Sequence, residues 1–296
     1  MKTKLVLLFI CFTAYQLQAQ DLDRLSQPQP DTTLTETSVR LNPWQQAKGE
    51  ILISPYISHY VADSYRNSRG TKINFADNGR YSNFNPRVFI AAPLISEKVN
   101  LIASIPYFFN KYETNSEFNT NTDFGDIELG LRFHLAKLKN NYLLGSLIGY
   151  IPGYENTSPP FAGYDLFALE SRLALVGNLP FLGEYNNFHK VELGFRYFFP
   201  NDPAQLRFLL SEGYRITSKL VLLGELEGMF SFSENEAFFN TNLQAVADYK
   251  MIKASGNMGY EFTPDVALYG GFFHDIYNRN AAIGRGFQLF SVIKIR

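Results

Sequence analysis

Charged side chains recur at every second position in several segments of the chain. In the segment FGDIELGLRFHL, Asp126, Glu128, Arg132 and His134 alternate with apolar residues. Successive side chains of a β-strand point to opposite faces, so this spacing gathers the charges on one polar face. Such a face supports two kinds of chemistry, namely ion pairing within the face or selection of a solute that passes along it.

The same projection applied to the other alternating segments predicts a set of residues that share this polar face. The set comprises Arg87, Asp126, Glu128, Arg132, His134, Glu170, Arg172, Glu192, Arg196, Glu225, Glu227, Lys253 and Glu261, and Lys190 falls on the same face. Its two signs of charge are nearly balanced. A ladder of ion pairs that closes a narrow lumen is therefore one interpretation. A polar pore or a binding cavity for a small solute is the other.

Catalysis would require a serine and a histidine on a common strand face, as in an outer-membrane hydrolase or acyltransferase. None of His59, His134, His189 and His274 has a serine two positions away. His274 lies next to Asp275, but neighbouring strand residues face opposite sides. A histidine could still meet a serine on a neighbouring strand. The sequence favours a protein without enzymatic activity, and it contains no motif that predicts a catalytic residue, a metal site or a cofactor.

The elements that must position these charges are strands. Alternating segments of about 11 to 14 residues are bounded by clusters of Gly, Pro, Asn or Asp, at residues 50–61, 81–92, 99–112, 124–135, 142–154, 165–177, 188–200, 205–216, 220–232, 251–262, 266–277 and 286–296. This pattern predicts an all-β fold, an antiparallel transmembrane β-barrel of about twelve strands. A soluble β-sandwich or a soluble barrel would produce the same alternation.

Loop lengths distinguish these alternatives. The connections ISEK, AKLKNN, TSK and TPD are short, whereas residues 62–80, 113–123, 155–164, 233–250 and 278–285 form longer connections at the other end. Short periplasmic turns and longer extracellular loops are typical of outer-membrane barrels. The stretch FFNTNLQAVADYK is assigned to an outer loop, because a thirteenth strand would make the number of strands odd, whereas outer-membrane barrels have an even number.

Two finer features accompany this assignment. Aromatic clusters at residues 107–109 and 197–199 fall where strands would cross the outer interface, which predicts a girdle, although aromatic residues also favour strands in general. Glu212 shares a face with Leu210 and Tyr214, which predicts a β-bulge.

The N-terminus carries a targeting signal. Lys2 and Lys4 precede an apolar run, and a cleavage position follows Ala19, so residues 1–19 are predicted to be a secretory signal peptide. Residues 20–48 are polar and rich in Pro, Gln and Thr, which predicts a flexible periplasmic segment, and residues 49–296 form the barrel. Cleavage would remove Cys11, the one cysteine.

Composition agrees with a membrane barrel. The chain has 16% aromatic and 19% charged residues, and its mean hydropathy is −0.14. After signal cleavage 25 of the 27 basic residues remain against 28 acidic ones, so nucleic acid is not expected as a partner. No apolar run after residue 20 is long enough for a membrane-spanning helix.

The segments NPWQQAKGE and GDIELGLRFHL resemble outer-membrane barrels of the phenol-degradation MetA-pathway type. The resemblance implies a transporter in the outer membrane of a Gram-negative bacterium, in contact with outer-membrane lipids, the barrel-assembly machinery and an unknown small solute. A structural or adhesive surface protein is a further alternative. The chain departs from the usual terminal signal of such barrels, because it ends in Arg296 rather than in an aromatic residue.

Overall fold

The computed structural model describes residues 46, 49–95, 98–138, 141–178, 187–200, 203–234 and 245–296. The predicted signal peptide, residues 1–19, lies outside this part of the chain, as do most residues of the predicted segment 20–48. Among the described residues, no helix combines the length and the apolar character needed to cross a membrane.

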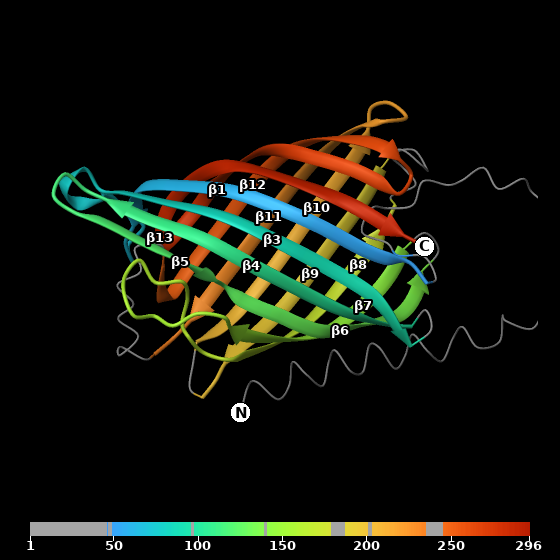
Figure 1. Ribbon diagram of the computed structural model, residues 1–296, viewed down its shortest axis with the longest axis horizontal. Coiled ribbons are helices and arrows are strands. Elements are labelled where there is room, and N and C mark those ends of the chain that lie inside the picture. Colours follow the sequence, from blue (N-terminus) through green and yellow to red (C-terminus); the bar gives the residue numbers. More distant parts are fainter. Residues whose placement is uncertain are drawn as a thin grey trace, which may run out of the picture. The chain divides into compact units, whose positions relative to one another are not determined.

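The described chain consists mainly of antiparallel strands (Figure 1). Their bounds are β1 Ile51–Arg66, β2 Lys72–Asn74, β3 Arg80–Ile95, β4 Val99–Glu113, β5 Phe118–Phe124, β6 Asp126–Leu138, β7 Asn141–Pro152, β8 Ala168–Gly177, β9 Asn187–Phe198, β10 Ala204–Arg215, β11 Leu220–Phe232, β12 Ala245–Thr263 and β13 Val266–Ile295. A short 3-10 turn, Ala76–Asn78, lies between β2 and β3.

The sheet closes into a barrel because β13 pairs with β1. β13 also pairs with β12, and each of these pairings is antiparallel. Since its first half pairs with β12 and its second half with β1, the chain reverses direction inside β13, near Asn280, whose φ is 52°. Within the described residues, eleven labelled strands thus form the wall and cross it twelve times, which confirms the predicted all-β barrel.

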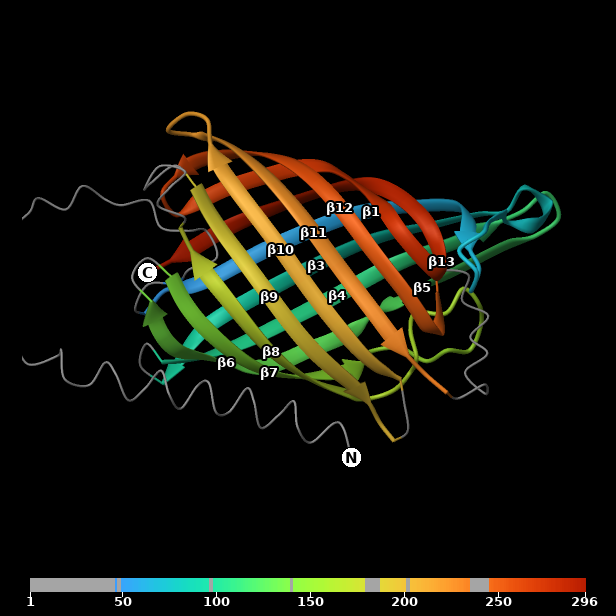
Figure 2. The same ribbon diagram turned by 180° about the vertical axis from the view of Figure 1, so that it is seen from behind.

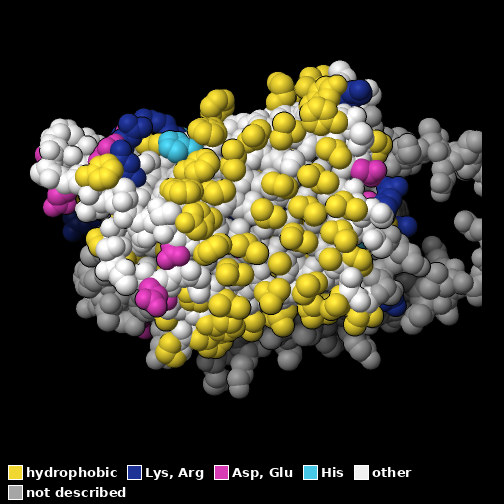
Figure 3. Space-filling view, viewed as in Figure 1, with side chains coloured by type: hydrophobic (Ala, Val, Ile, Leu, Met, Phe, Trp, Pro, Cys, Tyr) yellow, Lys and Arg dark blue, Asp and Glu magenta, His cyan; other side chains and the backbone are white. Residues whose placement is uncertain are grey.

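The wall has an apolar outside and a polar inside. Along β9, Leu193 and Phe195 are 53% and 52% exposed, whereas Arg196, the residue after Phe195, is buried. In Figure 3 hydrophobic side chains cover the middle of the visible wall, and most charged side chains lie toward its two ends. This distribution is the reverse of a soluble protein, and it follows from the period-two alternation of the sequence.

The outer end differs from the predicted loops in three places. β5 lies within the predicted loop 113–123 and pairs with the extended end of β4, while β2 pairs with the end of β1. β12 begins at Ala245, so residues 245–250 belong to a strand rather than to a loop. The predicted loop 278–285 is instead part of β13. In each case strand pairing extends into residues that were assigned to a loop. The number of wall crossings stays even, because β13 crosses the wall twice.

Of two finer predictions, one is wrong and the other is refined. The register of β10 with both neighbours shows no shift, so the predicted bulge at Glu212 is wrong. Glu212 lies opposite His189 on the outward face. The alternation divides the aromatic clusters between the two faces, because Tyr107 and Phe109 pack edge to face on the outside while Phe108 is buried.

Candidate functional site

The lumen contains a cavity of about 570 Å³. Every labelled strand of the closed wall contributes at least one side chain to its lining. Figure 2 shows β9, β10 and β11 side by side at a steep tilt. These strands carry much of the charged wall of the cavity. A cavity of this size falls within the range of small-molecule binding sites.

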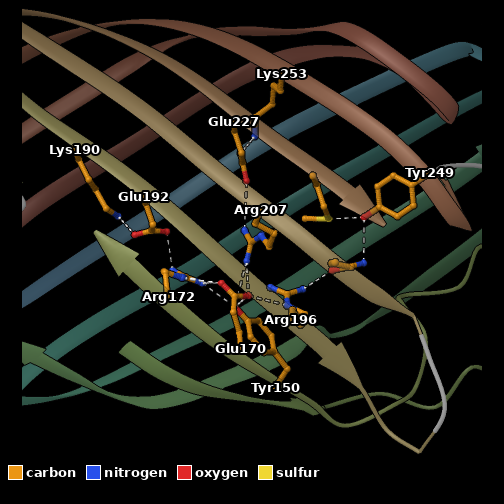
Figure 4. Close-up of polar contacts among 12 residues, drawn as sticks. Tyr150, Glu170, Arg172, Lys190, Glu192, Arg196, Arg207, Glu227, Tyr249 and Lys253 are labelled. Carbon is orange, nitrogen blue, oxygen red and sulfur yellow. Dashed lines mark hydrogen bonds and ion pairs between the residues drawn. The ribbon is translucent and has the colours of Figure 1, made fainter. Parts of the chain in front are cut away.

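Glu170 on β8 is the centre of the charged wall (Figure 4). Its carboxylate lies 2.7 Å from Arg172, 2.9 Å from Arg196 and 3.1 Å from Arg207, and it accepts a hydrogen bond of 2.9 Å from the Tyr150 hydroxyl. The Glu170 side chain is fully buried. Three guanidinium groups and a hydroxyl therefore satisfy one carboxylate, as a buried charge requires.

The contacts continue to two further carboxylates. Glu192 lies 3.1 Å from Arg172 and 2.8 Å from Lys190. Glu227 lies 3.5 Å from Arg207 and 2.6 Å from Lys253. We call Glu170, Glu192, Glu227 and their five cationic partners, Arg172, Lys190, Arg196, Arg207 and Lys253, the charge ladder. With five cations and three carboxylates, the ladder carries two positive charges in excess.

The wall formed by β1, β3 and β6 is different. The Arg87 guanidinium lies 4.5 Å from the centre of the Tyr56 ring, and Arg132 lies 5.7 Å from that of Phe89. All four side chains line the cavity. No ion pair or hydrogen bond joins either guanidinium to another described residue, so this wall holds its arginines through aromatic rings.

The remaining carboxylates of the cavity form no ion pair with a described residue. Glu225 accepts hydrogen bonds from neutral donors that include Ser255 and Asn257, at 3.1 and 3.3 Å. Asp275 accepts them from the Tyr60 hydroxyl and the Gly284 amide, at 3.1 and 2.8 Å. Glu128 has neither an ion pair nor a hydrogen bond to the described part of the chain.

The structure places the predicted polar-face residues on the inside of the wall but separates them into groups. The cavity is lined by Arg87, Glu128, Arg132, Arg172, Glu192, Glu225, Glu227 and Lys253. Glu170 and Arg196 belong to the charge ladder without lining the cavity.

The other three predicted residues belong neither to the cavity lining nor to the charge ladder, and they make contacts of their own. Asp126 accepts a hydrogen bond of 2.9 Å from Tyr154. His134 lies 3.3 Å from Asn100, and Glu261 pairs with Arg215 at 2.9 Å. These groups stabilise the wall at other places, so the predicted face is not one continuous site.

Arg207 is the main residue that sequence reasoning missed. It bridges two carboxylates of the ladder, Glu170 and Glu227. The alternation in QLRFLLSEGYRI was present, with Gln205, Arg207 and Ser211 on one face. Glu212, a single charge on the apolar face, disturbed this pattern and suggested a bulge in place of a regular strand.

His59 and His274 lie opposite apolar residues of the neighbouring strands. The register places His59 opposite Phe84 and Phe287, and His274 opposite Ala254. His274 faces outward, while the neighbouring Asp275 is buried inside. The two therefore point to opposite sides of the wall, as the spacing predicted.

No protein-family model and no curated protein match this chain. Solved structures do match its fold. The COG4313 outer membrane channel from Pseudomonas putida F1 has a TM-score of 0.67 at 13% identity, over 85% of this chain and 97% of that chain. The fold thus defines a β-barrel of the outer-membrane type.

Two other solved barrels are less similar. The translocator domain of the autotransporter NalP from Neisseria meningitidis has a TM-score of 0.47 at 11% identity, over 84% of this chain and 89% of that chain. The NanC porin has a TM-score of 0.49 at 9% identity, over 82% of this chain and all of the porin chain. The likeness at these identities concerns the fold alone.

Proposed function

We propose that this protein is a channel in the outer membrane of a Gram-negative bacterium and that it passes or holds a small solute in its lumen. The observation that carries the proposal is the combination of an apolar outer wall with a cavity of about 570 Å³ lined by polar and charged side chains. A barrel that only anchored a surface structure would not need such a cavity. Similarity to an outer-membrane channel supports the proposal.

The proposal extends to finer features. The resemblance of NPWQQAKGE and GDIELGLRFHL to barrels of the phenol-degradation MetA-pathway type favours a transporter of that kind. Its partners would be outer-membrane lipids, the barrel-assembly machinery and the solute. We assign no enzymatic activity, because the register brings no serine opposite His59 or His274.

Planar-bilayer recording of the refolded protein tests this function. We expect discrete conductance steps, and Glu128→Arg should change their size, because Glu128 lines the cavity and has no ion pair to break. Glu117→Arg, in the exposed connection between β4 and β5, is the matched control and should leave the steps unchanged. Absence of conductance, together with unchanged solute uptake in a deletion strain, would contradict a channel and favour an adhesive or structural surface protein.

A further inference from the structure

Two arginines of the cavity are held differently from those of the charge ladder. Every arginine of the charge ladder lies within 3.5 Å of a carboxylate, but Arg87 and Arg132 make no ion pair or hydrogen bond within the described chain. Both line the cavity. Their charge is consequently available to a molecule that enters the lumen.

Aromatic rings position these two guanidinium groups. Arg87 lies over Tyr56, which donates a hydrogen bond of 3.1 Å to Gln288, and the Tyr56 ring also stacks on Phe290. Arg132 lies over Phe89. A ring holds one face of a guanidinium and leaves its N–H edges free to donate. Each arginine therefore resembles a preorganised donor more than a mobile surface charge.

The electrostatic balance of the cavity favours an anion. The charge ladder has two positive charges in excess, and Arg87 and Arg132 add two more. Glu128, Glu225 and Asp275 contribute three negative charges, so the net charge of the cavity walls and the ladder is +1. Glu225 and Asp275 are already occupied by neutral donors, which leaves Glu128 as the one acidic group of the cavity lining without a described hydrogen bond or ion pair.

We propose that Arg87 and Arg132 form a recognition site for small organic anions, with a carboxylate as the group that they bind. Guanidinium N–H edges match the two oxygens of a carboxylate, and the cavity volume fits a small molecule. This inference rests on the proposed function and names the solute class of the channel. Glu128 lies in the same cavity and opposes binding of an anion.

Calorimetric titration of the full-length refolded barrel with butyrate tests the site without requiring conduction. Butyramide has the same shape but no charge, and we expect it to bind about tenfold more weakly or not at all. Arg87→Gln and Arg132→Gln should each weaken butyrate binding about tenfold, as loss of one charge-assisted contact implies. Neither arginine has an ion pair, so both variants should fold, which heat-modifiable migration on a gel verifies.

Two further variants sharpen the test. Arg285→Gln is the matched control, because Arg285 is 71% exposed and does not line the cavity, and it should bind butyrate like the wild type. Glu128→Gln should strengthen butyrate binding, since it removes a repulsive charge. Equal binding of butyrate and butyramide, or wild-type binding by both arginine variants, would overturn the anion site. Weaker butyrate binding in Glu128→Gln would overturn it as well.

The outcomes separate the site from the channel. Butyrate binding that depends on Arg87 and Arg132 supports the site even if no conductance is seen, in which case only the channel function fails. Conductance without any preference for butyrate over butyramide overturns the site and leaves the channel in place.

Discussion

Glu170 shows how a carboxylate can be fully buried inside the barrel. It contacts three arginines and one tyrosine hydroxyl, and these partners come from β7, β8, β9 and β10. The Arg196 guanidinium also stacks on the Tyr150 ring, 3.6 Å from its centre. Removal of Glu170 would take away a counter-charge from all three arginines at once, so the network acts as a unit.

Glu170→Gln should lower the free energy of unfolding by about 3 kcal/mol, because Arg196 would lose its one described ion pair, and Arg172 and Arg207 would each lose one of two. Glu227→Gln is the comparison, and its cost should be about 1 kcal/mol, since the Glu227 side chain is 34% exposed and water screens its ion pairs. Urea titration of the refolded variants in lipid vesicles measures both. Equal losses would mean that water, not Glu170, neutralises the three arginines.

At the scale of elements, strands extend past the outer rim. The outer ends of β3 and β4 pair with each other, and β5 pairs with β4 while β2 pairs with β1, which forms an arm that Figure 1 shows projecting from the barrel. At the seam, the turn inside β13 brings Gly284 against Tyr60, and the Tyr60 hydroxyl and the Gly284 amide both donate to Asp275. Paired strands, a short turn and side-chain contacts therefore form the arm and the seam, where the sequence predicted long loops.

Gly284→Ala should destabilise this seam. A Cβ atom at residue 284 would lie 1.9 Å from the Tyr60 ring, so Tyr60 must move and lose its hydrogen bond to Asp275. We expect a loss of about 2 kcal/mol in thermal or urea unfolding. Gly224→Ala is the control, because no atom lies within 4 Å of its added Cβ, and it should cost less than about 0.5 kcal/mol. Similar losses in the two variants would rule out the close approach at Gly284.

The arm should respond to acid through Asp77. Its carboxylate accepts hydrogen bonds from Ser116 and Asn115, at 2.8 and 2.9 Å, and these bonds lower the pKa of the Asp77 carboxyl. A lowered pKa means that the stabilisation is complete above the ordinary carboxyl pKa of about 4 and is lost as the pH falls through the lower value. Amide hydrogen exchange at residues 114–117 should therefore accelerate only below about pH 4.

Asp77→Asn serves as the control for that titration. Asparagine tolerates the positive φ of 54° at this position, and it has no carboxyl group to titrate. Exchange at residues 114–117 should then lose this acid-dependent step. An unchanged step in the variant would assign the pH response to another group.

At the scale of the whole molecule, the barrel combines an apolar outer surface with a polar interior. The charge ladder lies on one side of the lumen, and the aromatic and arginine wall of β1, β3 and β6 lies on another. Closure of β1 against β13 brings these walls around one cavity. The outside is therefore suited to lipid, while the inside is suited to a small polar solute.

A charge placed on the outer wall should measure its contact with lipid. Leu193 is central in the twelve-residue β9, and Leu193→Arg should cost about 3 kcal/mol in vesicles, because the charge would enter the hydrocarbon core. Ile95 is the last residue of β3, and Ile95→Arg should cost about 1 kcal/mol or less near the interface. Reversible unfolding in lipid vesicles compares the two. Equal costs would contradict a bilayer around the middle of the wall.

The sequence alone determined the fold class and the two faces of each strand. Period-two alternation decides that Glu128 and Arg172 point inward and that Leu193 points outward, because side-chain direction in a strand is a local property. Local spacing also predicted that His274 and Asp275 would face opposite sides. Arg207 escaped notice because one outlier, Glu212, disturbed an otherwise regular pattern.

Only the tertiary structure decided which inward groups meet. Glu170 and Arg207 are 37 residues apart and reach each other because two intervening ladders fix the register between β8 and β10. Register and closure depend on all strands together, so no local pattern could show that Arg87 and Arg132 form no ion pair with the described carboxylates. The sequence predicted a polar lumen, and the packing of the whole barrel divided it into an ion-paired ladder and a wall with two arginines that lie over aromatic rings.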